Sequence, residues 1–401
     1  VGQPEIWQIA CYYAGIFLLV FGRRYVEAWK RRGTYGEENV PGVIIHSNRF
    51  QHQIATVMIL GLLIGLLTGN FDRGSRVTFL DVGQGDGIVV ETGQGAYLFD
   101  CGSTSRKNIG EYVLKPYLKS RGICSLRGVF VSHPDEDHMN GVLELLENGE
   151  EWGITAEQLF LPAIRESERR ETFEQLLAAA EDAGIPVSYI KCGDEIRDSQ
   201  LRLLCLHPEE NTTLADANAY SECFYVEVFA KKMKQEAIDD RKANDASGGS
   251  AIGKISILLT GDVEGEGERQ LTQRLQALQE SRSLQESQSL QESRSLQESQ
   301  SLQTTRRLQE QRGQREFRVD ILKVAHHGSG YSTGTEFLAT ASPAIAIISC
   351  GRNNSYGHPH AETLQRLEDA RVPWYGTMDY GALTVNVDSH GNRLHGYLSG
   401  K

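Results

Sequence analysis

Five residues that could bind a metal ion occur within six positions of the sequence. The segment SHPDEDHMNG contains two imidazoles and three carboxylates, at His133, Asp135, Glu136, Asp137 and His138. It follows the apolar run 128–131, whose pattern predicts a short buried strand. Imidazole and carboxylate together suit Zn, Mn or Fe. The alternative is a charged surface turn, but such a turn needs no histidine at both ends, so we favour a metal-ligand cluster at the end of a strand.

Two later segments end apolar runs in residues of the same kinds. ISILLTGD ends in Asp262, and a carboxylate at a strand end can bridge two ions, although it could also be an ordinary helix N-cap. In DILKVAHHGS the apolar run is followed by His326 and His327, and adjacent histidines at a strand end rarely pack as core residues. One of them can bind metal while its neighbour faces substrate. The alternative for this second segment is a surface turn.

The elements that must position these residues begin near Val77. Short strand patterns such as VTFLDV, GIVVET and AYLFD are closely spaced, as in a β meander. Helical periodicity appears at 172–184 and 360–370. Strands and helices mixed along the chain in this way predict sheets covered by helices, in an α/β or α+β sandwich.

Two segments interrupt this pattern. Residues 231–253 are polar and end in DASGGSAIG, which predicts a flexible loop. Residues 277–303 contain LQESRS and LQESQS repeats, whose six-residue period matches neither the 3.6 of a helix nor the 3.5 of a coiled coil. We therefore expect flexible insertions near 231–253 and 277–316, the second of them partly helical and without a catalytic role.

Two uncharged segments near the beginning of the sequence, 6–21 and 53–68, are candidates for membrane-spanning helices. Each is slightly shorter than the roughly 20 residues that a span requires, and a pair of buried core helices is the alternative. The stretch 22–38 between them contains five basic residues, at Arg23, Arg24, Lys30, Arg31 and Arg32. Basic loops stay in the cytoplasm, so the chain after Asn70 is expected on the outer face of a cell membrane that it crosses more than once.

Composition limits the function in two ways. The chain has 401 residues and a net charge of −12, which argues against a protein that wraps duplex DNA by bulk charge, though not against a local groove or a metal site for phosphate. Its seven cysteines form no C-x-x-C pair, which argues against a cysteine zinc site. Free thiols are expected, with a disulfide left open.

The order of these motifs resembles that of the metallo-β-lactamase hydrolase superfamily. More closely, the segments LDVGQGDGIVVET, LFDCGS, SHPDEDHMNG, LLTGD, LKVAHHGS and NSYGHPH resemble the C-terminal domain of ComEC-family DNA-uptake proteins. The apolar segments resemble the end of that family's membrane channel. The resemblance implies an α/β fold, the metallo-β-lactamase αββα sandwich, at 73–401. It also implies that two transmembrane helices precede this domain, within a channel part at 1–72.

The resemblance also implies roles for single residues. The metal ligands would be His133, Asp135, Asp137, His138, Asp262 and His326. A substrate phosphate would meet His327, Ser329 and His358 in the same cleft. Behind the ligands, Asp100 would orient the cluster, and Asp86 would support the site from the GQGD turn, whose glycines permit tight turning.

The sequence departs from the superfamily at two positions. Asp135 stands where a histidine is usual, and no clear middle histidine compensates for it. His207 is one candidate for that role, while the stretch 218–221 occupies the corresponding Asn/Ser segment. The first metal position is therefore rich in oxygen ligands. We expect one or two divalent ions, with Mn²⁺ as suitable as Zn²⁺.

The expected reaction is metal-assisted hydrolysis of a phosphodiester, with Asp137 or Asp262 accepting a proton and His327 acting as acid. The resemblance implies DNA as substrate, with the non-transported strand degraded outside the membrane alongside other DNA-uptake components. One alternative is a phosphodiesterase for cell-wall phosphocholine, with an aromatic cage drawn from Trp374, Tyr375 and Tyr380. Another is a non-catalytic domain that guides DNA and holds a structural metal.

Overall fold

The computed structural model divides the chain into two compact units. One comprises Val1–Asp72 with Tyr117–Ile123, and the other comprises Arg73–Pro116 with Cys124–Lys401. The structure describes residues 8–17, 21, 56–61, 63, 65, 74–165, 171–210, 218–230, 253–296, 319–388 and 391–398, without the side chains of 282–296.

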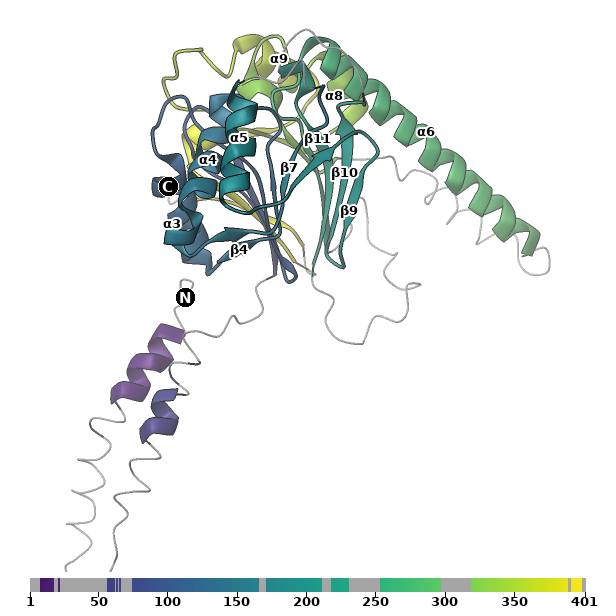
Figure 1. The fold of residues 1–401 in the computed structure, drawn as a ribbon. Helices are drawn as coiled ribbons and strands as arrows, with labels where there is room; N and C mark the ends of the chain where they lie inside the picture. Colours follow the sequence, from purple (N-terminus) through teal and green to yellow (C-terminus); the bar gives the residue numbers. More distant parts are fainter. Residues whose placement is uncertain are drawn as a thin grey trace, which may run out of the picture. The chain divides into compact units, whose positions relative to one another are not determined.

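The described part of the second unit contains two large sheets (Figure 1). The first has eight strands in the order β17-β16-β1-β2-β3-β5-β7-β8. It is antiparallel from β17 to β3 and parallel from β3 to β8. Its strands are β1 (Ser75–Phe79), β2 (Gly87–Thr92), β3 (Gly95–Cys101), β5 (Gly128–Phe130), β7 (Leu159–Pro162), β8 (Val187–Ile190), β16 (Leu383–Val387) and β17 (Arg393–Gly396).

The second sheet has seven strands in the order β15-β14-β13-β12-β11-β10-β9. It is parallel from β15 to β12 and antiparallel from β12 to β9. Its strands are β9 (Glu195–Arg197), β10 (Leu201–His207), β11 (Cys223–Phe229), β12 (Lys254–Leu259), β13 (Ile321–Lys323), β14 (Ile345–Ile348) and β15 (Trp374–Gly376). The short strands β4 (Ser125–Leu126) and β6 (Thr155–Ala156) form a separate parallel pair.

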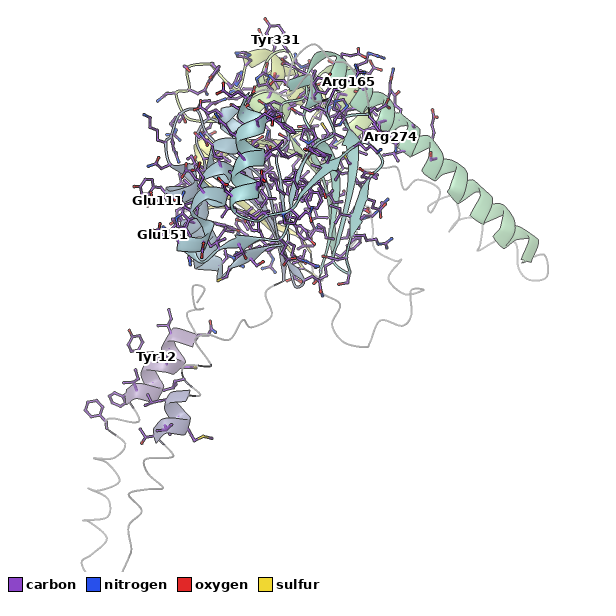
Figure 2. The ribbon with its side chains drawn as sticks, in the orientation of Figure 1. Tyr12, Glu111, Glu151, Arg165, Arg274 and Tyr331 are labelled. Carbon is purple, nitrogen blue, oxygen red and sulfur yellow. The ribbon has the colours of Figure 1, made fainter. Side chains whose placement is uncertain are left out.

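One core cluster combines the inner faces of both sheets. Phe99 and Phe130 of the first sheet stack at 4.7 Å between ring centroids, and both meet Phe224 of the second edge to face. The alternating residues Val77 and Phe79 of β1 belong to the same cluster. Because successive strand residues point to opposite faces, this alternation places one set of side chains between the sheets. Figure 2 shows the side chains packed between the two sheets.

Helices cover the outer faces (Figure 1). On the second sheet, α6, α8 and α9 supply Leu271, Leu275, Phe337 and Leu367 to a second core cluster. On the first sheet, α4 contacts β3 and α5. The described helices that follow β1 in the sequence are α3 (Lys115–Arg121), α4 (Glu136–Trp152), α5 (Glu171–Asp182), α6 (Gly265–Leu296), α8 (Thr335–Ala341), α9 (Ala361–Asp369) and α10 (Thr377–Tyr380), with the shorter turns η1 (Gly110–Leu114), η3 (Asn218–Tyr220) and η4 (Ala325–Gly328). The expected αββα sandwich is confirmed.

The structure describes only part of the two segments that interrupt the sequence pattern. Residues 231–252 lie outside the described residues, as do 297–316. The first copies of the six-residue repeat continue α6 as far as Leu296. Leu, Gln, Glu and Arg all have good helix propensity, so the backbone can remain helical even though the leucines form no single stripe.

The expected membrane spans lie largely outside the described residues. Residues 8–17 and 56–61 are helical, within the predicted spans 6–21 and 53–68. None of the helices in the described ranges has both the length and the apolar character that a bilayer crossing requires. All seven cysteines are free thiols, so the disulfide left open by the sequence does not form.

Candidate metal centre

The candidate site lies where strands of both sheets end. Asp100 is the second-last residue of β3, His133 follows β5, and Asp262 follows β12. The first turn of α4 supplies Asp137 and His138. The site is therefore built at the carboxyl ends of strands, where α/β sheets commonly place ligands.

Four side chains converge closely enough to share a metal ion. Asp137, His138, Asp262 and His327 each offer a ligand atom, and these atoms all lie within 4.8 Å of one another. His138 Nε2 is 3.1 Å from Asp262 Oδ1. His327 Nε2 is 3.4 Å from both Asp137 Oδ2 and Asp262 Oδ2. The side chains of His138, Asp262 and His327 are at most 3% exposed.

Atoms of this group and of the neighbouring His133 lack the hydrogen-bond partners that buried polar atoms normally have. Nε2 of His133, His138 and His327 and Oδ1 of Asp262 are buried and make no hydrogen bond. Most buried polar atoms in proteins are hydrogen-bonded, so several unpartnered lone pairs in one place call for another ligand. Imidazole nitrogens and carboxylate oxygens are suitable donors for a divalent transition metal. These residues therefore fit the metal that the sequence predicts.

Hydrogen bonds behind the cluster fix the orientation of two of the imidazoles. Asp100 Oδ2 lies 2.9 Å from His138 Nδ1, and the same carboxylate accepts hydrogen bonds from Ser132 N and Oγ. His327 Nδ1 donates to the carbonyl oxygen of Ser349 at 2.8 Å. With Nδ1 protonated in this way, the Nε2 lone pair of each ring is directed toward the cluster, an arrangement common at metal sites.

His133 is supported by two hydroxyl groups. Its Nδ1 lies 3.1 Å from Ser132 Oγ and 3.2 Å from Ser221 Oγ. Ser221 Oγ also accepts the backbone N–H of Asp262 at 3.2 Å. The predicted ligand Asp135 is close by, with Oδ2 3.8 Å from His133 Nε2, and it is about one third exposed.

The structure places the two adjacent histidines differently from what the roles expected from the sequence suggest. His327 points into the four-residue group, whereas His326 lies at its edge, with Nε2 3.7 Å from Asp262 Oδ2. His326 is held through Nδ1 by Glu264 at 2.9 Å and is 24% exposed. Both residues have left-handed backbone conformations, with φ of 48° and 54°, and Gly328 follows at φ 90°. This tight turn directs the second imidazole inward, which strand alternation does not predict.

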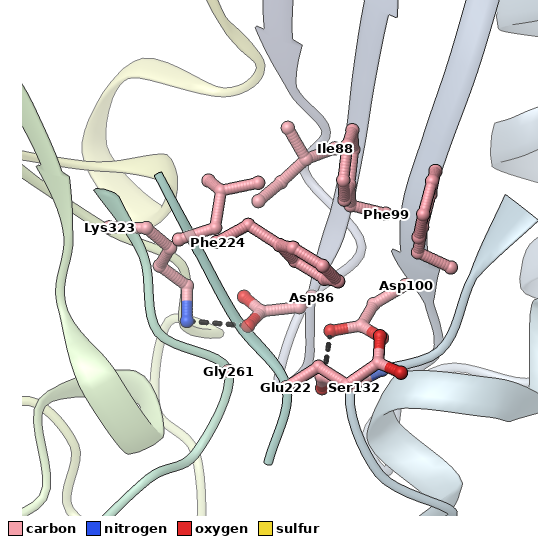
Figure 3. Close-up of a pocket in the computed structure, with 11 residues that line it drawn as sticks. Asp86, Ile88, Phe99, Asp100, Ser132, Glu222, Phe224, Gly261 and Lys323 are labelled. Atoms are coloured by element: carbon pink, nitrogen blue, oxygen red, sulfur yellow. Dashed lines mark hydrogen bonds and ion pairs between the residues drawn. The ribbon is translucent and has the colours of Figure 1, made fainter. Parts of the chain in front are cut away.

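A buried ion pair lies beneath the cluster. Lys323 Nζ is 2.5 Å from Asp86 Oδ2. The Asp86 carboxylate is also 3.8 Å from His327 Nδ1 and 3.9 Å from His138 Nδ1. Figure 3 shows this pair in a small internal pocket that also includes Glu222. Lys323 was not among the residues expected from the sequence, although a single cation inside the apolar run of β13 is a usable signal.

The GQGD turn packs directly against the first turn of α4. Asp86 N donates to Asp137 O at 3.0 Å. A Cβ on Gly85 would lie 2.2 Å from Gly102 O and 2.6 Å from Asp137 O. Only glycine permits so close an approach, which supports the structural role expected for this turn.

The electrostatics of the site favour a cation. Burial works to raise the pKa of Asp137, but the imidazoles of His327 and His138 outweigh it and lower that pKa to about 2. Burial works to lower the pKa of His138, but the carboxylates of Asp262 and Asp100 raise it well above its usual value. Positive charge is thus stabilised where the carboxylates converge, and a divalent ion would meet this demand.

An open cleft of about 280 Å³ adjoins the cluster. Its walls include the predicted residue His358, whose Nδ1 lies 3.3 Å from Gln84 Nε2. The other lining residues are Gln84, Thr104, Asp135, Glu136, Asp137, Asn218, Asp262, His326, His327 and Tyr356. No pattern of residue types in the sequence singles out Gln84 or Tyr356.

Other candidates do not reach this cleft. Ser329, for which a substrate contact was expected, is buried, its hydroxyl accepts the N–H of Tyr331, and it is not among the residues that line the cleft. His207 is buried with Nε2 donating to Ala219 O at 2.7 Å, and it is not part of the four-residue group. The proposed choline cage also does not line the cleft, and Tyr375 and Tyr380 pack edge to face on each other.

Comparison with known proteins agrees with this geometry. Residues 80–187 match the family model of the metallo-beta-lactamase superfamily. This segment contains Asp86, Asp100 and the first ligand cluster. The fold is therefore a mixed α/β metallo-β-lactamase fold, as the sequence predicted, and it carries candidate metal-binding residues.

The chain has curated relatives among competence proteins. It is 28% identical to ComE operon protein 3 of Bacillus subtilis over 81% of the chain, and 26% identical to Recombination protein 2 of Haemophilus influenzae over 93%. It is also 23% identical to competence protein ComA of Neisseria gonorrhoeae over 80% of the chain. The matches cover 35%, 38% and 33% of these proteins, so the chain spans about a third of their length. The predicted relationship to the ComEC family is confirmed by these homologues.

Proposed function

We propose that this homologue of competence proteins takes part in DNA uptake and that its sandwich domain is a metal-dependent nuclease. The observation that carries the proposal is the convergence of the unpartnered Nε2 atoms of His138 and His327 on Asp262, with His133 next to His138 and an open cleft beside them. Metal-dependent phosphodiester hydrolysis requires ligands for a cation and access for a phosphate, and this site offers both the ligand atoms and the cleft.

The residues that would hold the cation are His133, Asp137, His138, Asp262 and His327, with Asp135 at the edge. One or two ions, Mn²⁺ or Zn²⁺, would supply Lewis acidity toward the phosphate when bound. Asp262 suits a shared position, because Oδ1 faces His138 while Oδ2 faces both His326 and His327. Asp137 lines the cleft and is the group we propose to accept a proton during hydrolysis.

His326 is the histidine that we propose to contact substrate. It lines the cleft and is partly exposed, and Glu264 fixes its ring through Nδ1. The His327 Nδ1 proton is donated to a backbone carbonyl, which leaves Nε2 as a lone pair and makes this ring better suited to binding metal than to donating a proton. His358 completes the wall that a phosphate would approach.

The cellular setting is also a proposal. We propose that the domain lies on the extracytoplasmic face of the cell membrane, where it would degrade the strand that is not transported beside other uptake components. This placement rests on the uncharged segments 6–21 and 53–68 and on the basic residues between them. The competence relatives support the process, and the site chemistry supports a hydrolase.

The test is metal-dependent cleavage of single- and double-stranded DNA by the purified chain. We expect cleavage with Mn²⁺ or Zn²⁺, and a loss on the order of 10³-fold in Asp262→Asn, since the variant removes a charge that faces three imidazoles. Asp81→Asn is the matched control, because Asp81 forms an exposed pair with Arg106 and does not line the cleft. Hydrolysis of phosphocholine esters in preference to DNA, or full activity in Asp262→Asn, would count against the proposal.

A further inference from the structure

An aromatic residue stands at the rim of the metal cleft on a rigid support. Tyr356 lines the cleft and is 53% exposed, and its ring packs on that of His358 with centroids 5.7 Å apart and planes 25° apart. His358 in turn lies 5.6 Å from the ring of His326. Two ring-to-ring steps therefore connect Tyr356 with the histidine nearest the substrate position.

The loop that carries Tyr356 is held by hydrogen bonds. Asn354 Oδ1 accepts the backbone N–H groups of Tyr356 and His358, and its amide nitrogen donates to the carbonyls of Gly351 and His358. His360 accepts the N–H of Gly330 at Nδ1, so its Nε2 carries the proton and donates to Tyr356 O at 3.0 Å. This bonding fixes the Tyr356 backbone without burying its ring. An exposed tyrosine held in this way suggests a contact surface more than a packing residue.

The charges of the cleft limit how it could hold a nucleic acid. Among the described lining residues there is no Lys or Arg, and Asp135, Glu136 and Asp137 make one part acidic. Basic side chains usually supply most of the affinity for phosphate backbones, so this cleft would depend on the metal centre and on contacts with bases. Aromatic stacking is the base contact that tolerates any sequence, and it requires an unpaired base.

We propose that Tyr356, backed by His358, stacks on an unpaired nucleobase next to the phosphodiester at the metal centre, and so favours single-stranded DNA over small phosphodiesters. This inference rests on the proposed nuclease function and adds a residue that determines its specificity. Tyr356 binds substrate at the rim and makes no contact with the reacting atoms. Its effect is therefore on substrate affinity.

The test uses the full chain and three variants. Tyr356→Ala removes the ring, Tyr356→Phe keeps it, and Tyr397→Ala removes a more exposed tyrosine that does not line the cleft. Stacking is worth about 1–3 kcal/mol per base, which corresponds to roughly a 5- to 150-fold change in affinity. We expect Tyr356→Ala to raise KM for a single-stranded oligonucleotide within this range at nearly unchanged kcat. Tyr356→Phe and Tyr397→Ala should stay within about twofold of the parent chain.

Two readouts separate this inference from the nuclease proposal. Cleavage of an oligonucleotide with abasic sites on both sides of the scissile phosphodiester, which offers no ring to stack there, should be unaffected by Tyr356→Ala, and equal losses on both substrates would overturn the inference. A nuclease-resistant oligonucleotide carrying 2-aminopurine should lose fluorescence on binding the parent chain and Tyr356→Phe, but not Tyr356→Ala. If this quenching is seen without DNA cleavage, the inference that Tyr356 stacks on a base is kept and the nuclease proposal fails. If DNA is cleaved and quenching persists in Tyr356→Ala, only the stacking inference fails.

Discussion

Lys323 Nζ lies 2.5 Å from Asp86 Oδ2, and both side chains are only 1% exposed. The two residues are brought together from β13 and from the turn before β2, at opposite sheets of the sandwich. Burial works to lower the pKa of Lys323, but the charges of Asp86 and Asp262 raise it, so the ammonium remains charged. The pair thus joins the two sheets directly below the histidines of the metal centre.

Replacing one partner of this pair should be more costly than replacing both. Lys323→Met leaves the Asp86 carboxylate buried without its cation, and breaking a buried pair in this way typically costs about 3–5 kcal/mol. We expect a loss of that size in the free energy of unfolding, measured by urea denaturation. The double variant Lys323→Met/Asp86→Asn should recover much of the loss. Additive losses in this double-mutant cycle would show that the two residues are not coupled.

Substituting His326 and His327 one at a time should distinguish the residue that binds metal from the residue that contacts substrate. His327→Gln removes an unpartnered Nε2 that faces both Asp137 and Asp262, so we expect Mn²⁺ affinity to fall by at least about 10- to 100-fold. His326→Gln leaves the four-residue group intact, so Mn²⁺ affinity should change much less while turnover of a phosphodiester falls.

Titration calorimetry gives the affinities, and the rise in melting temperature with added Mn²⁺ provides a second measure that needs no catalysis. The opposite pattern, with metal binding lost in His326→Gln and kept in His327→Gln, would restore the assignment made from the sequence.

The stability of the folded chain should depend on pH through His207, a buried histidine outside the metal centre. Burial lowers the pKa of His207 from 6.5 to about 4. Between these two values the unfolded chain binds a proton that the folded chain does not, so stability rises with pH through this window and is lost as the pH falls. The loss on acidification from pH 6.5 to 4 should reach about 3 kcal/mol for this residue.

The matched variant is His207→Gln, which can keep a donor for the carbonyl of Ala219 but has no titratable ring. Its stability should depend less steeply on pH across the window, as measured by urea denaturation at a series of pH values. Parallel curves for the parent chain and the variant would show that His207 does not titrate as burial implies.

Local sequence was sufficient to locate much of the candidate site. His133, Asp137 and His138 lie within six positions, so a single strand end and the first turn of one helix bring them together. Asp262 and the His326–His327 pair also follow apolar runs, and the ends of strands in stacked sheets meet at a common edge. The alternation and helical periodicity of the remaining segments likewise predicted a sandwich, because these periods determine which faces are buried.

The tertiary structure decided what depends on backbone direction and on partners distant in sequence. Two successive left-handed residues turn His327 toward Asp262 and leave His326 at the edge, and no pattern of residue types specifies that turn. Lys323 acquires its role only when the sheets stack and Asp86 faces it. Tyr356 reaches the cleft because Asn354 fixes its loop beside the metal centre. The sequence by itself determined which chemical groups are present and that strand ends would gather them, whereas packing of the two sheets determined which atoms face one another.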